Sequence, residues 1–128
     1  MFPTGPLLDV HLDGRRTAPA DARRAMRELI GWSPPPEFAD DALLLTSEIV
    51  TNAVTAAGQC RLQAWFHTEH GRLHVEVHDS DPTIPVAVGP RSATDECGRG
   101  LHIVDMVASH WGVKPDHDGK SVWFAIHC

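Results

Sequence analysis

Several features that define other protein classes are missing from this chain of 128 residues. It contains no Tyr, only three Cys, and no apolar run close to the roughly 18 residues that a membrane-spanning helix needs. Cys60, Cys97 and Cys128 are odd in number and include no CxxC pair, which fits neither a disulfide framework nor a zinc knuckle. No basic, apolar leader opens the chain. We therefore expect a soluble, cytoplasmic protein that is not exported.

Basic residues are also scarce relative to acidic ones. The chain has 11 Lys and Arg against 17 Asp and Glu, a formal net charge of −6. Nucleic-acid affinity depends on clustered cations that displace counterions, so this balance argues against a direct nucleic-acid partner. The length allows a single domain over residues 1–128, with a core that depends on neither disulfides nor a structural metal.

Hydrophobic periodicity predicts alternating strands and helices. Residues 80–97 lack any period and contain three prolines, which indicates a functional lid or a mobile segment between ordered elements. The first 17 residues form a tail with one edge strand. The expected elements, in chain order, are a strand at 7–12, helices at 19–32 and 37–57, a hairpin over 60–79, a helix from 101 to about 111, and a closing hairpin over 113–126.

Two polar side chains of the long helix stand one turn apart, next to its apolar face. Glu48 and Asn52 have the spacing i, i+4, which places them on the same side of a helix. An Asn amide oxygen can ligate Mg²⁺, and a Glu one turn away can orient or deprotonate an attacking group. This pair alone is most often a solvated face, so its meaning depends on the other candidates.

Two more candidates follow along the chain. Asp79 falls on the apolar face at the end of its strand, where a buried carboxylate needs a partner such as the exocyclic amine of adenine. Gly98 and Gly100 let backbone N–H groups approach an anion at a helix N-terminus, and Arg99 adds a cation, an arrangement that suits phosphates. Together these features describe a site for a charged ligand with a planar head group.

At these positions the chain resembles the histidine-kinase-like ATPase superfamily. Residues 48–53 (EIVTNA) look like its N box, 77–82 (VHDSDP) like its adenine box, and 98–104 (GRGLHIV) like its second glycine box. Residues 111–113 (WGV) and 119–124 (GKSVWF) are similar to the ends of the anti-sigma-factor serine/threonine kinase-like branch, especially its single-domain actinobacterial members. The resemblance runs from about residue 19 to residue 126.

This resemblance implies the Bergerat ATP-binding fold: a two-layer α/β sandwich whose mixed, mainly antiparallel sheet is backed by about three helices, with the ATP lid at 80–97. It implies ATP and Mg²⁺ as ligands, with Glu48 as the general base for phosphoryl transfer to a protein serine. Ser121 aligns with a hydroxyl residue that lies near the adenine-binding Asp in relatives. The implied ligand contacts are Asn52 for Mg²⁺, Asp79 for the adenine amine, and Gly98, Arg99, Gly100 and Leu101 for the phosphates.

Two departures from the family pattern leave two functions open. Many relatives have Asp-x-Gly-x-Gly where this chain has residues 79–82 (DSDP), and a basic residue often follows the N box where residues 55–57 (TAA) stand here. The first reading is an ATP-binding regulator that phosphorylates a serine of a partner, either a sigma factor or a STAS-type anti-sigma-factor antagonist. The alternative is a nucleotide-responsive binding module without turnover. Both readings leave a homodimer open.

The nine histidines suggest a rival reading. With a turn at residues 70–71, His67 would lie opposite His74, with Glu76 and His78 on the same face, a set competent for Zn²⁺ or Ni²⁺. We expect this face of the hairpin to be solvated instead, because histidines on an open sheet usually meet only water. Trp65 is expected to be exposed on that face; Trp111 and Trp123 are expected in the core.

Overall fold

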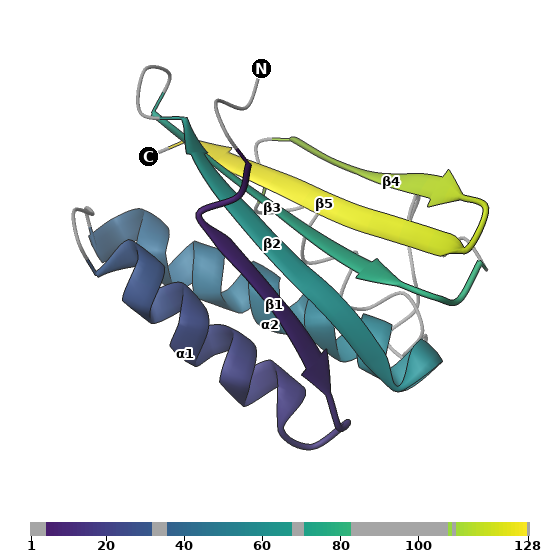
Figure 1. Ribbon diagram of the computed structural model, residues 1–128. Helices are drawn as coiled ribbons and strands as arrows, with labels where there is room; N and C mark the ends of the chain where they lie inside the picture. Colours follow the sequence, from purple (N-terminus) through teal and green to yellow (C-terminus); the bar gives the residue numbers. More distant parts are fainter. Residues whose placement is uncertain (1–4, 32–35, 68–70, 83–107, 109, 128) are drawn as a thin grey trace, which may run out of the picture.

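The computed structural model describes residues 5–31, 36–67, 71–82, 108 and 110–127. In this part of the chain two helices lie side by side on one face of a five-stranded sheet (Figure 1). The elements are β1 (Leu8–Asp13), α1 (Ala18–Ile30), α2 (Pro36–Ala57), β2 (Gln59–His67), β3 (Arg72–Asp79), β4 (His110–Asp116) and β5 (Gly119–His127).

The expected α/β sandwich is confirmed. The strand order is β1-β2-β3-β5-β4, and all four pairings are antiparallel, whereas a mixed sheet was expected. The predicted helix from 101 to about 111 and residues 83–97 of the predicted lid fall almost wholly outside the described residues. Where that helix was expected to end, His110 already begins β4, so residues 110–112 are strand instead.

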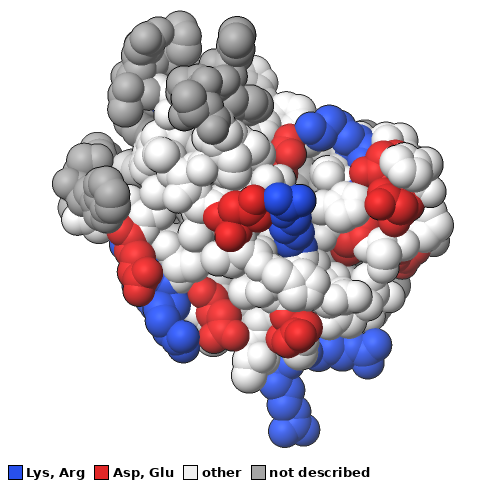
Figure 2. Space-filling model, viewed as in Figure 1, with Lys and Arg blue, Asp and Glu red and all other residues white. Residues whose placement is uncertain are grey.

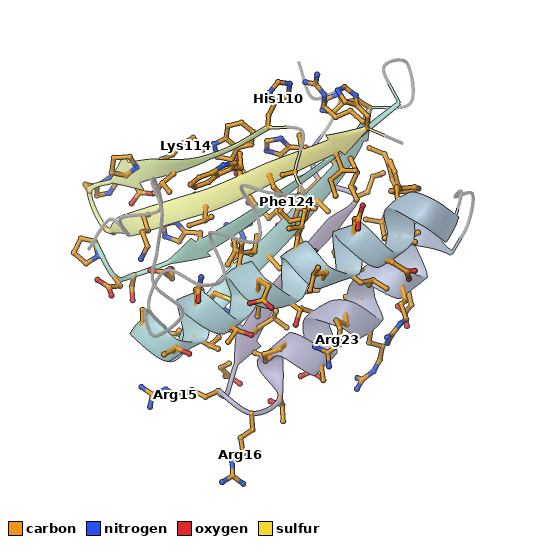
Figure 3. The ribbon with its side chains drawn as sticks, turned by 180° about the vertical axis from the view of Figure 1, so that it is seen from behind. Arg15, Arg16, Arg23, His110, Lys114 and Phe124 are labelled. Atoms are coloured by element: carbon orange, nitrogen blue, oxygen red, sulfur yellow. The ribbon has the colours of Figure 1, made fainter. Side chains whose placement is uncertain are left out.

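The hydrophobic core lies between the helices and the sheet. In α1, four buried residues recur at every fourth position, Ala18, Ala22, Met26 and Ile30, and the alanines among them permit close packing against α2. Phe124 lies on the helix-facing side of β5, fully buried between the sheet and α2 (Figure 3). The buried residues of α2, like those of α1, recur at spacings of three and four, the period of an amphipathic helix.

Gly58 sets how α2 passes into the sheet. It has a φ of 82° and donates its N–H to the carbonyl of Val54 at 2.8 Å, a left-handed helix end that favours glycine. Strand β2 begins at the next residue, and its Arg61 pairs with His78 near the end of β3. The C-terminal end of α2 therefore lies at the same end of the sheet as the last residues of β3 (Figure 1).

The β2–β3 register corrects the predicted hairpin. Trp65, not His67, lies opposite His74, and His67 pairs with Arg72, because residues 68–71 connect the strands instead of a two-residue turn. The shift is two residues, so every side chain keeps its expected face of the sheet. The predicted pairing of His67 with His74, on which the metal reading rested, is wrong.

The sheet face opposite the helices carries an aromatic cluster. The His74 ring stacks on Trp123 with 5.3 Å between centroids, and its other neighbour is Trp65 at 5.5 Å in an edge-on arrangement. Trp65 is only 8% exposed, against the expectation of an exposed indole, and Trp123 lies half-buried on this face and not in the core. Trp111 packs against the core as expected.

The surface shows no broad basic region on the side seen in Figure 2. Lys and Arg side chains are interspersed there with Asp and Glu among the described residues. Neither described helix has the length and apolar character to cross a membrane.

Candidate functional site

Helix α2 places Glu48 and Asn52 at the border between its buried and exposed sides. Leu45 and Ile49, which flank them on the helix surface, are buried in the core, whereas Thr51 is exposed. Glu48 and Asn52 themselves are half-buried and one turn apart. The structure therefore places this pair on the rim of the core, as the sequence predicted.

The amide of Asn52 has an orphaned atom. Its Nδ2 is buried and has no hydrogen-bond partner among the described residues. Leaving a buried polar group unpaired costs about 1–3 kcal/mol, so this group calls for a partner outside the described part of the chain. Because rotation of the amide exchanges its oxygen and nitrogen, either a hydrogen-bond acceptor or a cation can be met at this place.

Asp79 ends β3 on the helix-facing side of the sheet. It is 3% exposed, and its neighbours Val77 and Val122 are buried and paired across β3 and β5, which gives Asp79 an apolar wall. The Oδ1 atom accepts a hydrogen bond from the N–H of Asp81 at 2.8 Å and another from Nζ of Lys120 at 3.0 Å. Its Oδ2 atom accepts none from the described residues.

Lys120 is the residue of this site that sequence reasoning missed. It pairs with Asp79 across β3 and β5, is 5% exposed, and also donates from Nζ to the carbonyl of Asp81 at 2.9 Å. The signal was available, because Val122 and Phe124 are apolar and alternation places Lys120 on the same buried face. Lysine is rarely buried unless it is paired, and the partner, Asp79, belongs to a distant strand.

Gly119 allows the two strands to approach at this point. Its φ is 152°, and a Cβ added there would lie 1.9 Å from the carbonyl oxygen of Asp79. No side chain fits in that space, so the close contact between the start of β5 and the end of β3 requires glycine. The contact holds Lys120, the next residue, directly against Asp79.

Ser121 lies elsewhere, which corrects its expected place near Asp79. It pairs with His78, and its Oγ is 3.2 Å from Nδ1 of His78 on the sheet face opposite the helices. Asp116, the last residue of β4, and Asp118, in the turn that follows, also approach the His78 ring, at 3.4 and 3.8 Å. Ser121 thus belongs to this exposed group, and Lys120 takes the position beside Asp79.

Cys60, near the start of β2, lies at the same end of the sandwich as Asp79. Burial raises the pKa of its thiol to about 12, and the charge of Asp79 raises it further in the same direction. Cys60 is the second residue of β2 and Asp79 is the last residue of β3, and the two strands are antiparallel, so both lie at the end of the sheet where α2 passes into β2. Asp79 ends β3 at this end of the sheet, and Glu48 and Asn52 lie in the C-terminal half of α2, the helix that leads into β2 there.

The remaining predicted contacts, Gly98, Arg99, Gly100 and Leu101, lie outside the described residues, so their positions are still predictions. Among the described residues, the site consists of a carboxylate held by a buried lysine and an amide with an unpaired atom.

Three comparisons with known proteins bear on this site. A family model described as "Histidine kinase-like ATPase domain" matches residues 15–126. An uncharacterized protein of Streptomyces coelicolor is 43% identical over 53 residues, which cover 41% of this chain and 50% of that protein. The histidine kinase domain of a blue-light activated histidine kinase from Erythrobacter litoralis is similar in structure, with a TM-score of 0.56 and 20% identity over 88% of this chain and 60% of that chain.

The three findings differ in what they establish. At 20% identity the structural likeness shows the fold alone. The Streptomyces protein is matched over only half its length and carries no stated activity. The family model spans most of the chain, including the helix with Asn52, the strand with Asp79 and the closing strands. The chain therefore belongs to the histidine kinase-like ATPase domain family.

Proposed function

We propose that this domain binds ATP with Mg²⁺ at the end of the sandwich where α2 passes into the sheet. The observation that carries the proposal is Asp79, a buried carboxylate on an apolar wall whose Oδ2 accepts no hydrogen bond from the described residues. A buried acceptor of this kind is suited to the exocyclic amine of adenine, whose flat, apolar ring would pack on Val77 and Val122.

The residues of α2 fit Mg²⁺ by their chemistry. Mg²⁺ takes oxygen ligands, keeps several waters, and completes its shell with substrate phosphates. The half-buried carboxamide of Asn52, with its unpaired atom, supports a role as the protein ligand, and Glu48 lies one turn away. When bound, the ion would neutralise phosphate charge. Gly98, Arg99, Gly100 and Leu101 are the proposed phosphate contacts.

For the biological role we propose control of a partner protein, either a sigma factor or a STAS-type antagonist. The resemblance of residues 111–113 and 119–124 to the anti-sigma-factor kinase branch supports this choice. In the kinase reading, Glu48 accepts the proton of the attacking serine hydroxyl as the phosphoryl group transfers. The Glu48 side chain is half-buried beside the core, compatible with a base at the rim of a site.

A binding module without turnover is the second candidate, and one observation favours it. Two hydrogen bonds fix the backbone just after β3. The Asp79 carboxylate accepts one from the N–H of Asp81, and the Lys120 ammonium donates the other to the carbonyl of Asp81. Asp81 stands where many relatives have the first permissive glycine, and Pro82 follows it. A segment fixed in this way suits a stable nucleotide-bound state better than repeated opening and closing.

Calorimetric titration with ATP and Mg²⁺ tests the binding proposal. We expect Asp79→Asn and Asn52→Ala to weaken ATP binding by at least about tenfold, since each removes a hydrogen bond or metal contact to the ligand. Matched controls are Asp118→Asn, which removes the same charge from an exposed turn, and Thr55→Ala on the exposed side of α2. A wild-type protein that binds no ATP, or site variants that bind like their controls, would reject the proposal.

Phosphorylation of candidate antagonists separates the two roles. In the kinase reading, Glu48→Gln abolishes transfer of labelled phosphate to the partner serine while ATP binding persists. If the wild-type protein binds ATP and the partner but transfers no phosphate to any serine, the binding module is the correct reading.

A further inference from the structure

Strand β5 holds a buried ammonium group directly against Asp79. The side chains of Lys120 and Asp79 are only 6% and 2% exposed, and their charged atoms are 3.0 Å apart. Removing one partner of such a pair leaves the other charge buried and unpaired in an apolar environment, which is strongly unfavourable. Lys120 therefore supplies from within the protein the positive charge that Asp79 needs.

The two carboxylate oxygens of Asp79 differ in their hydrogen bonds. Oδ1 accepts both the Lys120 ammonium and the Asp81 N–H, so it is committed to the protein. Oδ2 accepts no hydrogen bond from any described residue and keeps its lone pairs for another donor. Because the two bonds to Oδ1 come from different elements, the carboxylate is fixed in its rotation as well as its place.

We propose that Lys120 is a positioning residue that sets base selectivity at this site, an inference that rests on the proposed binding of ATP. It orients the Asp79 carboxylate so that Oδ2 faces the exocyclic amine of the base. It also fixes the backbone after β3 through the Asp81 carbonyl. Since the charge of Asp79 is already balanced, the subsite favours a neutral amine donor over a cation.

This role predicts an effect on selectivity beyond any effect on folding. ATP and purine riboside triphosphate differ only in the 6-amino group that Oδ2 would accept. A hydrogen bond to a charged group gives a preference for ATP of about 10- to 100-fold. If Lys120 positions the acceptor, its loss removes this preference. If Lys120 only stabilises the fold, its loss weakens both nucleotides equally.

The first test is Lys120→Met, which keeps the length and apolar stem of the side chain. Affinities for both nucleotides are measured by calorimetry with Mg²⁺, alongside thermal unfolding. We expect the preference for ATP to fall below about threefold. Lys114→Met is the matched control, because Lys114 is exposed on β4 and pairs with Glu76 instead; it should keep the wild-type preference.

A second measurement uses the wild-type protein, so it holds even if Lys120→Met does not fold. The chain has only two lysines, Lys114 and Lys120, so protein labelled with ¹⁵N at lysine Nζ has two ammonium signals, which Lys114→Met assigns. We expect the Lys120 signal to be protected from water exchange both without and with ATP. Loss of that protection on ATP binding would mean that the ligand displaces Lys120, and would overturn the proposal.

The outcomes separate this inference from the proposed function. If the wild-type protein binds neither nucleotide, the proposed function is refuted, and the inference about Lys120 is refuted with it. A wild-type protein that prefers ATP, together with a Lys120→Met variant that keeps the preference or weakens both nucleotides equally, leaves ATP binding in place and refutes the role of Lys120.

Discussion

Replacing Gly119 by Ala tests the close contact on which the Asp79–Lys120 pair depends. The new Cβ would lie 1.9 Å from the Asp79 carbonyl oxygen and 2.8 Å from Cα of Ser80, both of them rigid backbone atoms. Real Cβ atoms essentially never come within 3.0 Å of such atoms, so the start of β5 must move away from β3 by about 1 Å. The φ of 152° adds conformational strain for any residue with a side chain.

The expected loss of stability follows from these two terms. Overpacking of this kind costs about 1–3 kcal/mol, and a residue held in a sparsely populated backbone conformation costs about 1–3 kcal/mol. We therefore expect the free energy of unfolding to fall by about 2–6 kcal/mol, a large part of the roughly 5–15 kcal/mol typical of a domain. The melting temperature should fall by about 10–20 °C, at roughly 4 °C per kcal/mol.

Urea unfolding followed by circular dichroism measures this change, and Gly58→Ala is its matched control. Gly58 also has a positive φ, 82°, but nothing lies within 4 Å of the Cβ that would be added there. The difference between the two variants isolates the steric clash from the backbone strain. A Gly119→Ala variant within about 1 kcal/mol of Gly58→Ala would refute the close contact, and with it the physical basis of the site.

Two further predictions concern ionisable groups. The hydrogen bond from His74 lowers the pKa of the Glu76 carboxyl below its ordinary value, and the hydrogen bond from Lys114 makes a smaller contribution in the same direction. A lowered carboxyl pKa contributes stability above the pKa of the unfolded chain and loses it as the pH falls through the folded value. Glu76→Gln should therefore lose less stability than wild type between pH 7 and pH 3 in urea titrations, while Glu28→Gln, exposed on α1, should behave as wild type. Burial raises the pKa of the Cys60 thiol to about 12, so mass spectrometry should show Cys60 unmodified by a thiol reagent at pH 7.5 until urea unfolds the chain. Labelling of Cys60 in the native state at the rate of an exposed thiol would contradict its burial.

Local pattern predicted much of the site because helices and strand faces depend on neighbouring residues. The four-residue spacing in α1, the position of Glu48 and Asn52 one turn apart, and the buried face of Asp79 all follow from the periods of helix and strand. The family was recognisable from short motifs in order along the chain. None of these inferences requires knowledge of which strands are neighbours.

The pairing between strands was harder to predict from the sequence than the helices and the faces of the strands. The shift of the β2–β3 register places Trp65, instead of His67, opposite His74, so the pairing on which the rival metal reading rested does not form. The length of the connection at 68–71 decides that register, and residues that favour turns occur at both ends of it. A two-residue error preserved every face and therefore left no trace in the hydrophobic pattern.

By itself, the sequence determined the fold family, the two helices with their buried faces, and the carboxylate at the end of β3. Only the tertiary structure decided what that carboxylate meets. Lys120 is 41 residues away along the chain, and it reaches Asp79 because β5 lies beside β3 and Gly119 lets the two backbones touch. Alternation places Lys120 on a buried face, but a contact between distant strands depends on their order in the sheet, which no local period encodes.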